Sequence, residues 1–144
     1  ALYIDQVNMF LPTDIRVLGI TRTTKSFNAK CYCTHRNYHY LLPTYILQPH
    51  AVPLEDISAS RTSYRIDVAT LSTLRTTLQK YLGTHNYHNF TQNKDAADAN
   101  SLRHMLYFDA GEPFLQQDVE YVCLTVKGQS FLLNQVAPFL LLVD

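Results

Sequence analysis

The sequence predicts an α+β fold, in which helices pack on one face of a mostly antiparallel sheet. Apolar residues recur every three or four positions between Val68 and Leu82, which is the period of an amphipathic helix. The segments from Leu102 to Phe108 and from Val119 to Val126 alternate in the way that paired antiparallel strands do. Two earlier segments are rich in branched and aromatic residues, which favour further strands.

Length and composition indicate one globular domain, because 144 residues, 47% of them hydrophobic, suffice for a single core. Twelve basic and twelve acidic residues give a formal net charge of zero, which argues mildly against autonomous nucleic-acid binding. It does not exclude such binding, since charge can be segregated between two faces. No apolar run approaches the roughly 18 residues that a membrane span needs.

The first half of the chain predicts two strand regions. After the mildly apolar segment from Tyr3 to Phe10, a proline turn leads to Ile15 to Ile20, which is predicted to be a strand. The segment from Phe27 to Leu47 is predicted to form one long strand or two successive strands, with a break or an edge at Pro43.

Three cysteines give neither an even disulfide framework nor a CxxC metal pair, so a reducing compartment is the simpler interpretation. Cys31 and Cys33 would lie on the same side of a strand, as small residues that fill the core.

In the second half, residues from His50 to Arg61 are predicted to form an exposed connector. The helix from Val68 to Leu82 should end at a glycine cap, Gly83, and the polar stretch from Gln92 to Asn100 should be a loop. The last two strands are joined through Gly111, Glu112 and Pro113.

Two clusters carry candidate chemistry. The block from Gly83 to Thr91 concentrates imidazoles, amides, hydroxyls and aromatic rings, which suit either nucleic-acid contacts or turn capping and core packing. In the block from Thr34 to Thr44, Arg36, Tyr38 and Tyr40 share one face of a strand, where a guanidinium beside rings suits a phosphate and a stacked base. The alternative is that these tyrosines face the core and the arginine faces solvent.

A metal site is not expected, although two histidine pairs occur. His85 and His88, like His35 and His39, lack a carboxylate or thiolate at suitable spacing.

Five blocks in order resemble the TruA family of tRNA pseudouridine synthases, in its eukaryotic synthase I branch. The most specific of them is Gly83 to Thr91. The five blocks are residues 10–19, 27–30, 36–44, 83–91 and 127–131.

This resemblance implies a cofactor-free isomerisation of uridine to pseudouridine in tRNA, which requires the base to leave its stack. By similarity Tyr38 lies against the target uracil, Lys30 and Arg36 hold phosphate or shape the pocket, and Phe131 is an apolar wall. Four further residues are implied either to order a loop or to touch RNA: His85, Asn86, His88 and Asn89.

The resemblance also implies parts that this sequence does not contain. The family's catalytic aspartate lies in a loop that reads approximately Arg-Thr-Asp-Lys-Gly-Val, and neither Asp5 nor Asp14 has that context. Residues 137–144 resemble a much later closing strand of the family. We therefore expect residues 1–144 to be a single, incomplete synthase domain, with a seam between Val136 and Ala137 and another before Ala1.

Two other functions remain open from the sequence. One is a catalytically inactive TruA-like subunit that binds RNA in a ribosome or ribosome-assembly complex, with rRNA as its partner. The other is an unrelated ferredoxin-like interaction module. The compartment is open among nucleus, cytoplasm and mitochondrion.

Overall fold

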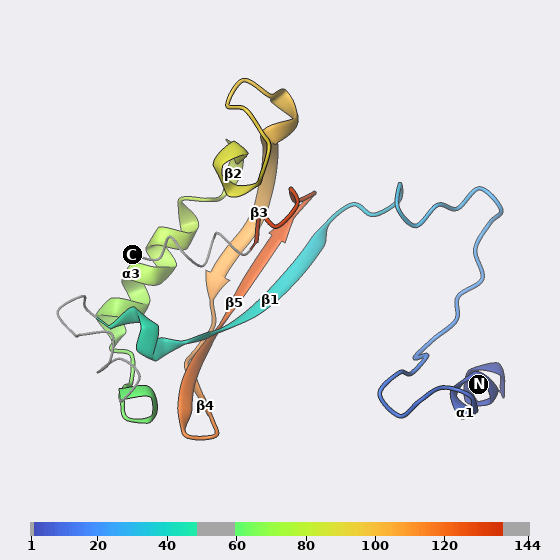
Figure 1. Ribbon diagram of the computed structural model, residues 1–144, viewed down its shortest axis with the longest axis horizontal. Coiled ribbons are helices and arrows are strands. Elements are labelled where there is room, and N and C mark those ends of the chain that lie inside the picture. The colour runs from blue at the N-terminus through green and yellow to red at the C-terminus, as the bar shows by residue number, and fades with distance from the viewer. Residues whose placement is uncertain (1, 49–59, 137–144) are drawn as a thin grey trace. The chain divides into compact units, whose positions relative to one another are not determined.

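The computed structural model describes residues 2–48 and 60–136 (Figure 1). Those residues belong to two compact units, residues 1–33 and residues 34–144, which are described separately.

The first unit contains helix α1 (Leu2–Met9), which the sequence analysis did not predict, and none of residues 3–33 is buried. The strand predicted from Ile15 to Ile20 is wrong, because the segment has no strand partner within this unit. The Asn8 amide instead satisfies the backbone of Val17, accepting from its N–H at 2.8 Å and donating to its carbonyl at 2.9 Å. Branched residues favoured an extended backbone but could not supply a partner for it.

The end of the first unit is a turn built around Asn28. Its side-chain oxygen accepts hydrogen bonds from the backbone N–H groups of Lys30 and Cys31, at 3.0 and 3.2 Å. The strand prediction is therefore wrong for residues 27–33, and Cys31 is exposed while Cys33 is half-buried. These cysteines are not core residues, because the turn presents their side chains away from any packed layer.

The second unit confirms the α+β class, with an open antiparallel sheet in the order β1-β5-β3-β2, and β4 beside β5 (Figure 1). The strand that was predicted within residues 27–47 begins only at Arg36, and it ends at Pro43 on an edge of the sheet, as a proline favours. The pairing of the two later strands is also confirmed. The strands are β1 (Arg36–Pro43), β2 (Gly83–Asn86), β3 (Leu102–Ala110), β4 (Phe114–Gln116) and β5 (Val119–Gly128).

Helix α3 (Val68–Gln79) confirms the predicted amphipathic helix, although it ends earlier than expected. It begins at Asp67, whose carboxylate accepts from the backbone N–H and the hydroxyl of Thr70 at 2.9 and 2.7 Å. These hydrogen bonds lower the pKa of Asp67. Residues 80–82 form a turn, and Gly83 does not cap the helix but opens β2 with a φ of 92°, a left-handed conformation that suits glycine.

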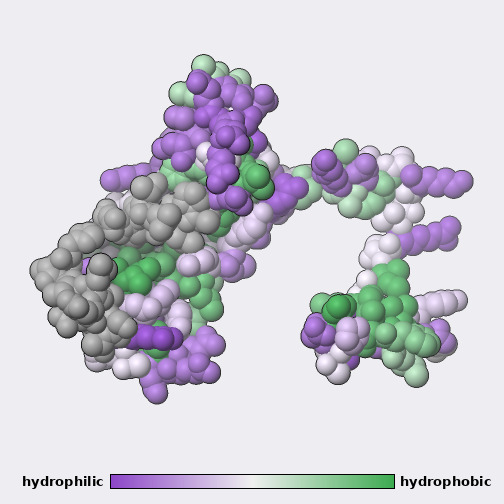
Figure 2. Space-filling model, viewed as in Figure 1, coloured by the Kyte–Doolittle hydropathy of each residue, from purple (hydrophilic) through white to green (hydrophobic). Residues whose placement is uncertain are grey.

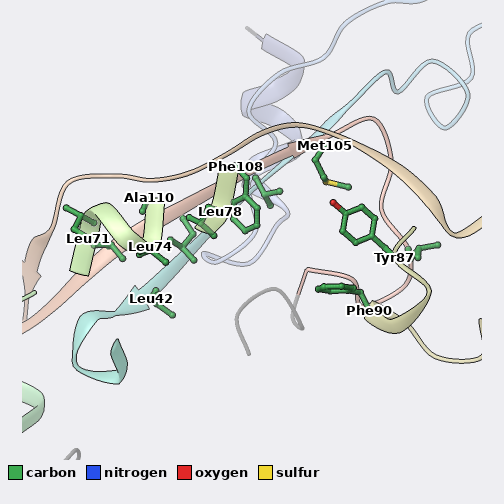
Figure 3. Close-up of a cluster of buried hydrophobic side chains, with 13 residues drawn as sticks. Leu42, Leu71, Leu74, Leu78, Tyr87, Phe90, Met105, Phe108 and Ala110 are labelled. Carbon is green, nitrogen blue, oxygen red and sulfur yellow. The ribbon is translucent and has the colours of Figure 1, made fainter. Parts of the chain in front are cut away.

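The core lies between α3 and one face of the sheet (Figure 3). Three leucines of the helix, Leu71, Leu74 and Leu78, are buried, as the three- and four-residue spacing predicts. They meet alternate residues of β1, β3 and β5, all in the same cluster: Leu42, Phe108, Ala110, Val122, Leu124 and Val126. The cluster continues past the end of the helix through Met105, Tyr87, Phe90 and Leu132.

A tight hairpin and a buried carboxylate hold the other end of the sheet. Gln117 and Asp118, with φ of 48° and 65°, join β4 to β5, a two-residue turn that the sequence analysis missed. Glu120, only 9% exposed, accepts hydrogen bonds from the Thr44 hydroxyl at 2.8 Å and the Ile66 N–H at 2.7 Å. One side chain therefore connects β5 to the segments on either side of the connector.

Short 3-10 helices complete the second unit: η1 (Thr44–Leu47), η2 (Ser60–Thr62), η3 (His88–Phe90) and η4 (Ala99–Ser101). The predicted loop from Gln92 to Asn100 is confirmed, apart from the start of η4. The predicted connector lies outside the described residues except for its last two positions, and so does the expected seam, since Ala137 is not described. Within the described ranges, no helix is long and apolar enough to span a membrane.

Candidate functional site

The inner face of β1 changes from core to solvent along the strand. Leu42 is 1% exposed under α3, whereas Tyr40 and Tyr38 on the same face are 42% and 40% exposed, and Arg36 is exposed. The predicted sharing of one face by Arg36, Tyr38 and Tyr40 is confirmed by the strand, and neither tyrosine is sealed inside the core.

Tyr38 meets Phe131 at the uncovered end of this face. Their ring centroids are 4.9 Å apart and the ring planes are inclined at 87°, an edge-to-face contact. Phe131 is half-buried and packs against the core cluster, so its ring is supported from behind while Tyr38 remains accessible. Two of the residues that the resemblance selected, 93 positions apart in sequence (131 − 38), thus form one aromatic corner.

Gly128 makes this corner possible. It is buried at the end of β5, opposite Arg36 on one side and Met105 on the other. A β-carbon at this position would lie 2.9 Å from Cζ of Phe131 and 3.1 Å from Sδ of Met105. Only glycine therefore leaves room for the phenylalanine ring beside Tyr38.

Residues 129–136, which we name the Phe131 loop, are fixed at several points. The Gln129 N–H donates to the carbonyl of His104 at 3.2 Å, and Leu132, 8% exposed, packs in the core. The Thr91 hydroxyl donates to the carbonyl of Leu133 at 2.8 Å. The loop thus connects two parts of the unit to the aromatic corner: β3, and the block from Gly83 to Thr91, which we name the histidine-rich block.

The side chain of Gln135 fixes the loop from within. It is 0% exposed, and its Oε1 accepts from the Leu132 N–H at 2.7 Å. Between them Asn134 adopts a φ of 60°, a left-handed conformation that asparagine tolerates better than most residues. The loop is therefore a defined turn of the backbone.

The block from Gly83 to Thr91 divides its residues between core and surface. Tyr87 is 2% exposed, and its hydroxyl donates to the Tyr81 carbonyl at 2.9 Å. Burial, with a smaller contribution from Tyr81, raises the pKa of Tyr87 to about 12. Phe90, 7% exposed, contacts Tyr87 edge to face at 5.3 Å. The aromatic half of the block is a structural anchor.

The polar half of the block is exposed and forms local hydrogen bonds. His85 Nε2 lies 2.8 Å from the Leu82 carbonyl, and the Asn86 amide donates to the Ala96 carbonyl at 2.7 Å. The Asn86 side-chain oxygen accepts from the His88 N–H at 3.1 Å. Figure 2 shows that hydrophilic residues cover much of the end of the unit that carries β2 and this loop.

The structure brings some predicted site residues together and separates others. Tyr38 of β1 contacts Phe131 of the loop after β5, and Arg36 lies two residues before Tyr38 on the same strand, whereas His85 lies on β2 at the opposite edge of the sheet. Three strand spacings separate β1 from β2, about 14 Å. Asn86 follows His85 at the end of β2, and His88 begins η3. Lys30 belongs to the first unit, and its exposed side chain is described only there.

The charge at the corner is cationic. Among the described residues no carboxylate forms an ion pair with Arg36, so its guanidinium is available to a phosphate. The described part of the chain contains no group of three histidine, cysteine, aspartate or glutamate side chains that could hold a metal.

Sequence reasoning missed the supports of this site. Gly128 acts through the absence of a side chain and His104 through its backbone carbonyl, so their residue types carried no chemical signal, while the hydroxyl of Thr91 bonds to a carbonyl 42 residues away. A signal did exist for Glu120, because it is the one carboxylate in a mostly apolar strand.

Comparison with known proteins finds relatives that match most of the chain. A family model described as tRNA pseudouridine synthase matches residues 77–138, which include the histidine-rich block, β3, β5 and the Phe131 loop. The mouse and human proteins named pseudouridylate synthase 1 homolog are each 38% identical over 140 residues, 97% of this chain and 32% of each relative. The Saccharomyces cerevisiae protein named tRNA pseudouridine synthase 1 is 26% identical over 204 residues, 91% of this chain and 38% of that protein.

The chain spans about a third of the length of the curated relatives it matches. The match covers nearly all of the chain itself, and the aromatic corner, the Phe131 loop and the histidine-rich block all lie within it. The chain belongs to the TruA family of tRNA pseudouridine synthases.

Proposed function

We propose that this chain is part of an isomerase that converts uridine to pseudouridine in tRNA, and that Tyr38 is the ring against which the flipped uracil rests. The observation that supports this most directly is the aromatic corner, in which Tyr38 is 40% exposed and meets Phe131 at 87°. The names of the relatives, tRNA pseudouridine synthase 1 and pseudouridylate synthase 1 homolog, support the same reaction. We also propose that residues 1–144 belong to a single synthase domain.

Two perpendicular rings suit a flat base outside its helix. A uracil that stacks on one ring meets the edge of the other, so its face and its edge are both fixed. Unstacking a base costs a few kcal/mol, and stacking on a protein ring returns about 1–3 kcal/mol per base. In this proposal the corner of Tyr38 and Phe131 offsets most of the cost of flipping.

Arg36 supplies the charge in this arrangement. It lies two residues from Tyr38 on the same face, a rise of about 7 Å along the strand, so a nucleotide on Tyr38 would bring its backbone within reach. The guanidinium fork is suited to two phosphate oxygens. We propose that Lys30 provides a further phosphate contact, and that the exposed His85 and Asn86 and the half-buried His88 contact RNA that flanks the target nucleotide.

The proposed reaction also requires the family's aspartate nucleophile. Residues 1–144 contain no segment that resembles its loop, so this proposal places the nucleophile in the part of the protein outside this sequence. The chain itself would bind, orient and enclose the base. No cofactor takes part in the proposed isomerisation.

The test uses the full-length protein that contains this chain, with Tyr38→Phe and Tyr38→Ala variants. We expect both to lose pseudouridine formation on unmodified tRNA without unfolding, with a loss of roughly 5- to 150-fold for Tyr38→Ala if about 1–3 kcal/mol of stacking disappears. Tyr107→Phe and Tyr107→Ala are matched controls, because Tyr107 is 46% exposed but adjoins the buried Phe108 and so faces the other side of β3. Thermal unfolding measures the fold of each variant.

Two outcomes would contradict the proposal. One is wild-type activity in both Tyr38 variants. The other is an absence of pseudouridine formation by the wild-type protein, on tRNA and on rRNA alike. Mapping pseudouridines in both RNAs after deletion of the gene separates a tRNA substrate from an rRNA substrate. RNA binding without any loss of pseudouridine after deletion would instead support the inactive subunit of a ribonucleoprotein assembly, which no described contact favours.

A further inference from the structure

Gln135 fixes the Phe131 loop from within, and the outer side of the loop has a further contact from outside. Leu132 secures the inner side by packing in the core, but the next residue, Leu133, is 78% exposed and its side chain holds nothing in place. The backbone then turns through the left-handed Asn134. The orientation of this part of the loop therefore depends on backbone hydrogen bonds.

Thr91 supplies such a bond from outside the loop. It follows η3, and its extended backbone, with φ of −148° and ψ of 165°, leads the chain out of the core beside the buried Phe90. From this fixed position its hydroxyl donates to the Leu133 carbonyl at 2.8 Å, across 42 residues of sequence. The anchor is rigid because Phe90 packs against Tyr87 and both are buried.

The connection extends to the aromatic corner. Leu133 is two residues from Phe131, whose ring is 4.9 Å from that of Tyr38. At the start of the loop, the Phe131 ring lies close to Gly128, since a β-carbon there would lie 2.9 Å from Cζ of the ring. A change in the loop at Leu133 would therefore shift the Phe131 ring relative to Tyr38.

We propose that Thr91 is a positioning residue, whose hydroxyl holds the Phe131 loop so that the Phe131 ring stays perpendicular to Tyr38 at the uracil site. This inference rests on the proposed function, because it assigns the histidine-rich block a role in shaping the site that receives the base. The block then acts at β1 through the loop, although its own strand lies at the far edge of the sheet.

The test compares Thr91→Val, which keeps the shape of the side chain and removes the hydroxyl, with Thr91→Ser, which keeps the hydroxyl. We expect Thr91→Val in the full-length protein to slow single-turnover pseudouridine formation roughly fivefold, the effect of about one hydrogen bond. Affinity for tRNA should change by less than about twofold, because phosphate contacts dominate it. Thr91→Ser should keep the wild-type rate. Thr76→Val is the matched control, since that hydroxyl bonds only locally, to Ser72 on α3.

Two measurements distinguish positioning from a general effect on stability. NMR of protein with labelled tyrosine and phenylalanine should show a nuclear Overhauser effect between Tyr38 and Phe131 that weakens in Thr91→Val and persists in Thr91→Ser. In a Phe131→Leu background, Thr91→Val should cause no further loss of rate, because the two residues act through one contact.

Each possible result bears on the positioning role of Thr91. An unchanged ring contact in Thr91→Val, or a rate loss that adds in full to that of Phe131→Leu, overturns the positioning role. A lost ring contact with an unchanged rate overturns its importance for the reaction. If the wild-type protein forms no pseudouridine, the proposed function fails, and the ring contact alone then decides whether Thr91 positions Phe131.

Discussion

Substitution of Gly128 by alanine tests the geometry of the aromatic corner directly. The added β-carbon would lie 2.9 Å from Cζ and 3.1 Å from Cε2 of Phe131, and 3.1 Å from Sδ of Met105. Carbon atoms prefer separations of about 3.5–4.0 Å, so these contacts are strongly repulsive. Met105 is 1% exposed and cannot retreat freely, whereas the half-buried Phe131 ring can move. The ring therefore leaves its position against Tyr38.

The expected loss of stability depends on which side chain moves to make room for the added β-carbon. Overpacking a core usually costs about 1–3 kcal/mol, and the lower half of that range applies because the colliding atoms belong to the free end of a side chain. Loss of the edge-to-face contact with Tyr38 accounts for about 0.5–1.5 kcal/mol of it. If the same energy is lost at the transition state, pseudouridine formation slows by about tenfold. Gly128→Ala should therefore affect activity more visibly than stability.

The assay pairs urea unfolding with single-turnover pseudouridine formation on unmodified tRNA. Gly111→Ala is the matched control, because a β-carbon there would lie 3.5 Å from the Cys123 carbonyl oxygen, an ordinary contact. Neither glycine has a left-handed φ, so backbone strain does not confuse the comparison. If Gly128→Ala matched Gly111→Ala in both stability and rate, the close approach of Phe131 to β5 would not shape the site.

Two further predictions concern stability. Glu120→Ala should lower the free energy of unfolding in urea by about 2–3 kcal/mol, because a buried hydroxyl and a backbone N–H lose their acceptor, whereas Glu120→Gln retains an acceptor oxygen and should lose less. Tyr87 has a folded pKa of about 12 against an ordinary value of 10.0, so between these pH values the unfolded state releases a proton that the folded state keeps. Its contribution to stability is complete below pH 10 and is lost as the pH rises toward 12, by up to about 1.4 kcal/mol per pH unit. Unfolding of Tyr87→Phe, measured over the same pH range, should lack this component, and an identical pH dependence in the two proteins would contradict the assignment.

The elements that could be predicted from the sequence are those in which apolar residues recur along the face that packs in the core. The leucines of α3 and the alternating residues of β5 reveal helix and strand because most of their inward positions are apolar. The segment from Ile15 to Ile20 has the same composition, but composition does not reveal a hydrogen-bonding partner. In the structure the amide of Asn8 takes that place for Val17. Pairing between distant segments is the information that local patterns lack.

The candidate site was predictable in its residue types and less so in its arrangement. Arg36 and Tyr38 follow from the period of a strand, whereas the contact with Phe131 could be anticipated only from resemblance, since it joins residues 93 positions apart (131 − 38). The roles of Gly128 and Thr91 depend on a missing side chain and on one carbonyl bond. Neither leaves a mark in composition or periodicity.

One row of residues across the sheet explains why motifs far apart in sequence meet. Arg36 pairs with Gly128, Gly128 with Met105, and Met105 with Gly83, so residues from three of the five blocks that resemble the family lie at a single level of the sheet. This alignment depends on an irregularity, because Met105 and Phe108 are both buried although their odd separation would place them on opposite faces of a regular strand.

The register shift between Met105 and Tyr107 resolves the conflict. It inserts one extra residue, Leu106, so that Met105 supports the Phe131 ring while Phe108 packs beneath α3 on the same face. Leu106 and Tyr107 are exposed as a result, at 43% and 46%. The bulge lies at the level where the cover of α3 ends, and it therefore joins the packed part of the sheet to the part that presents Tyr38.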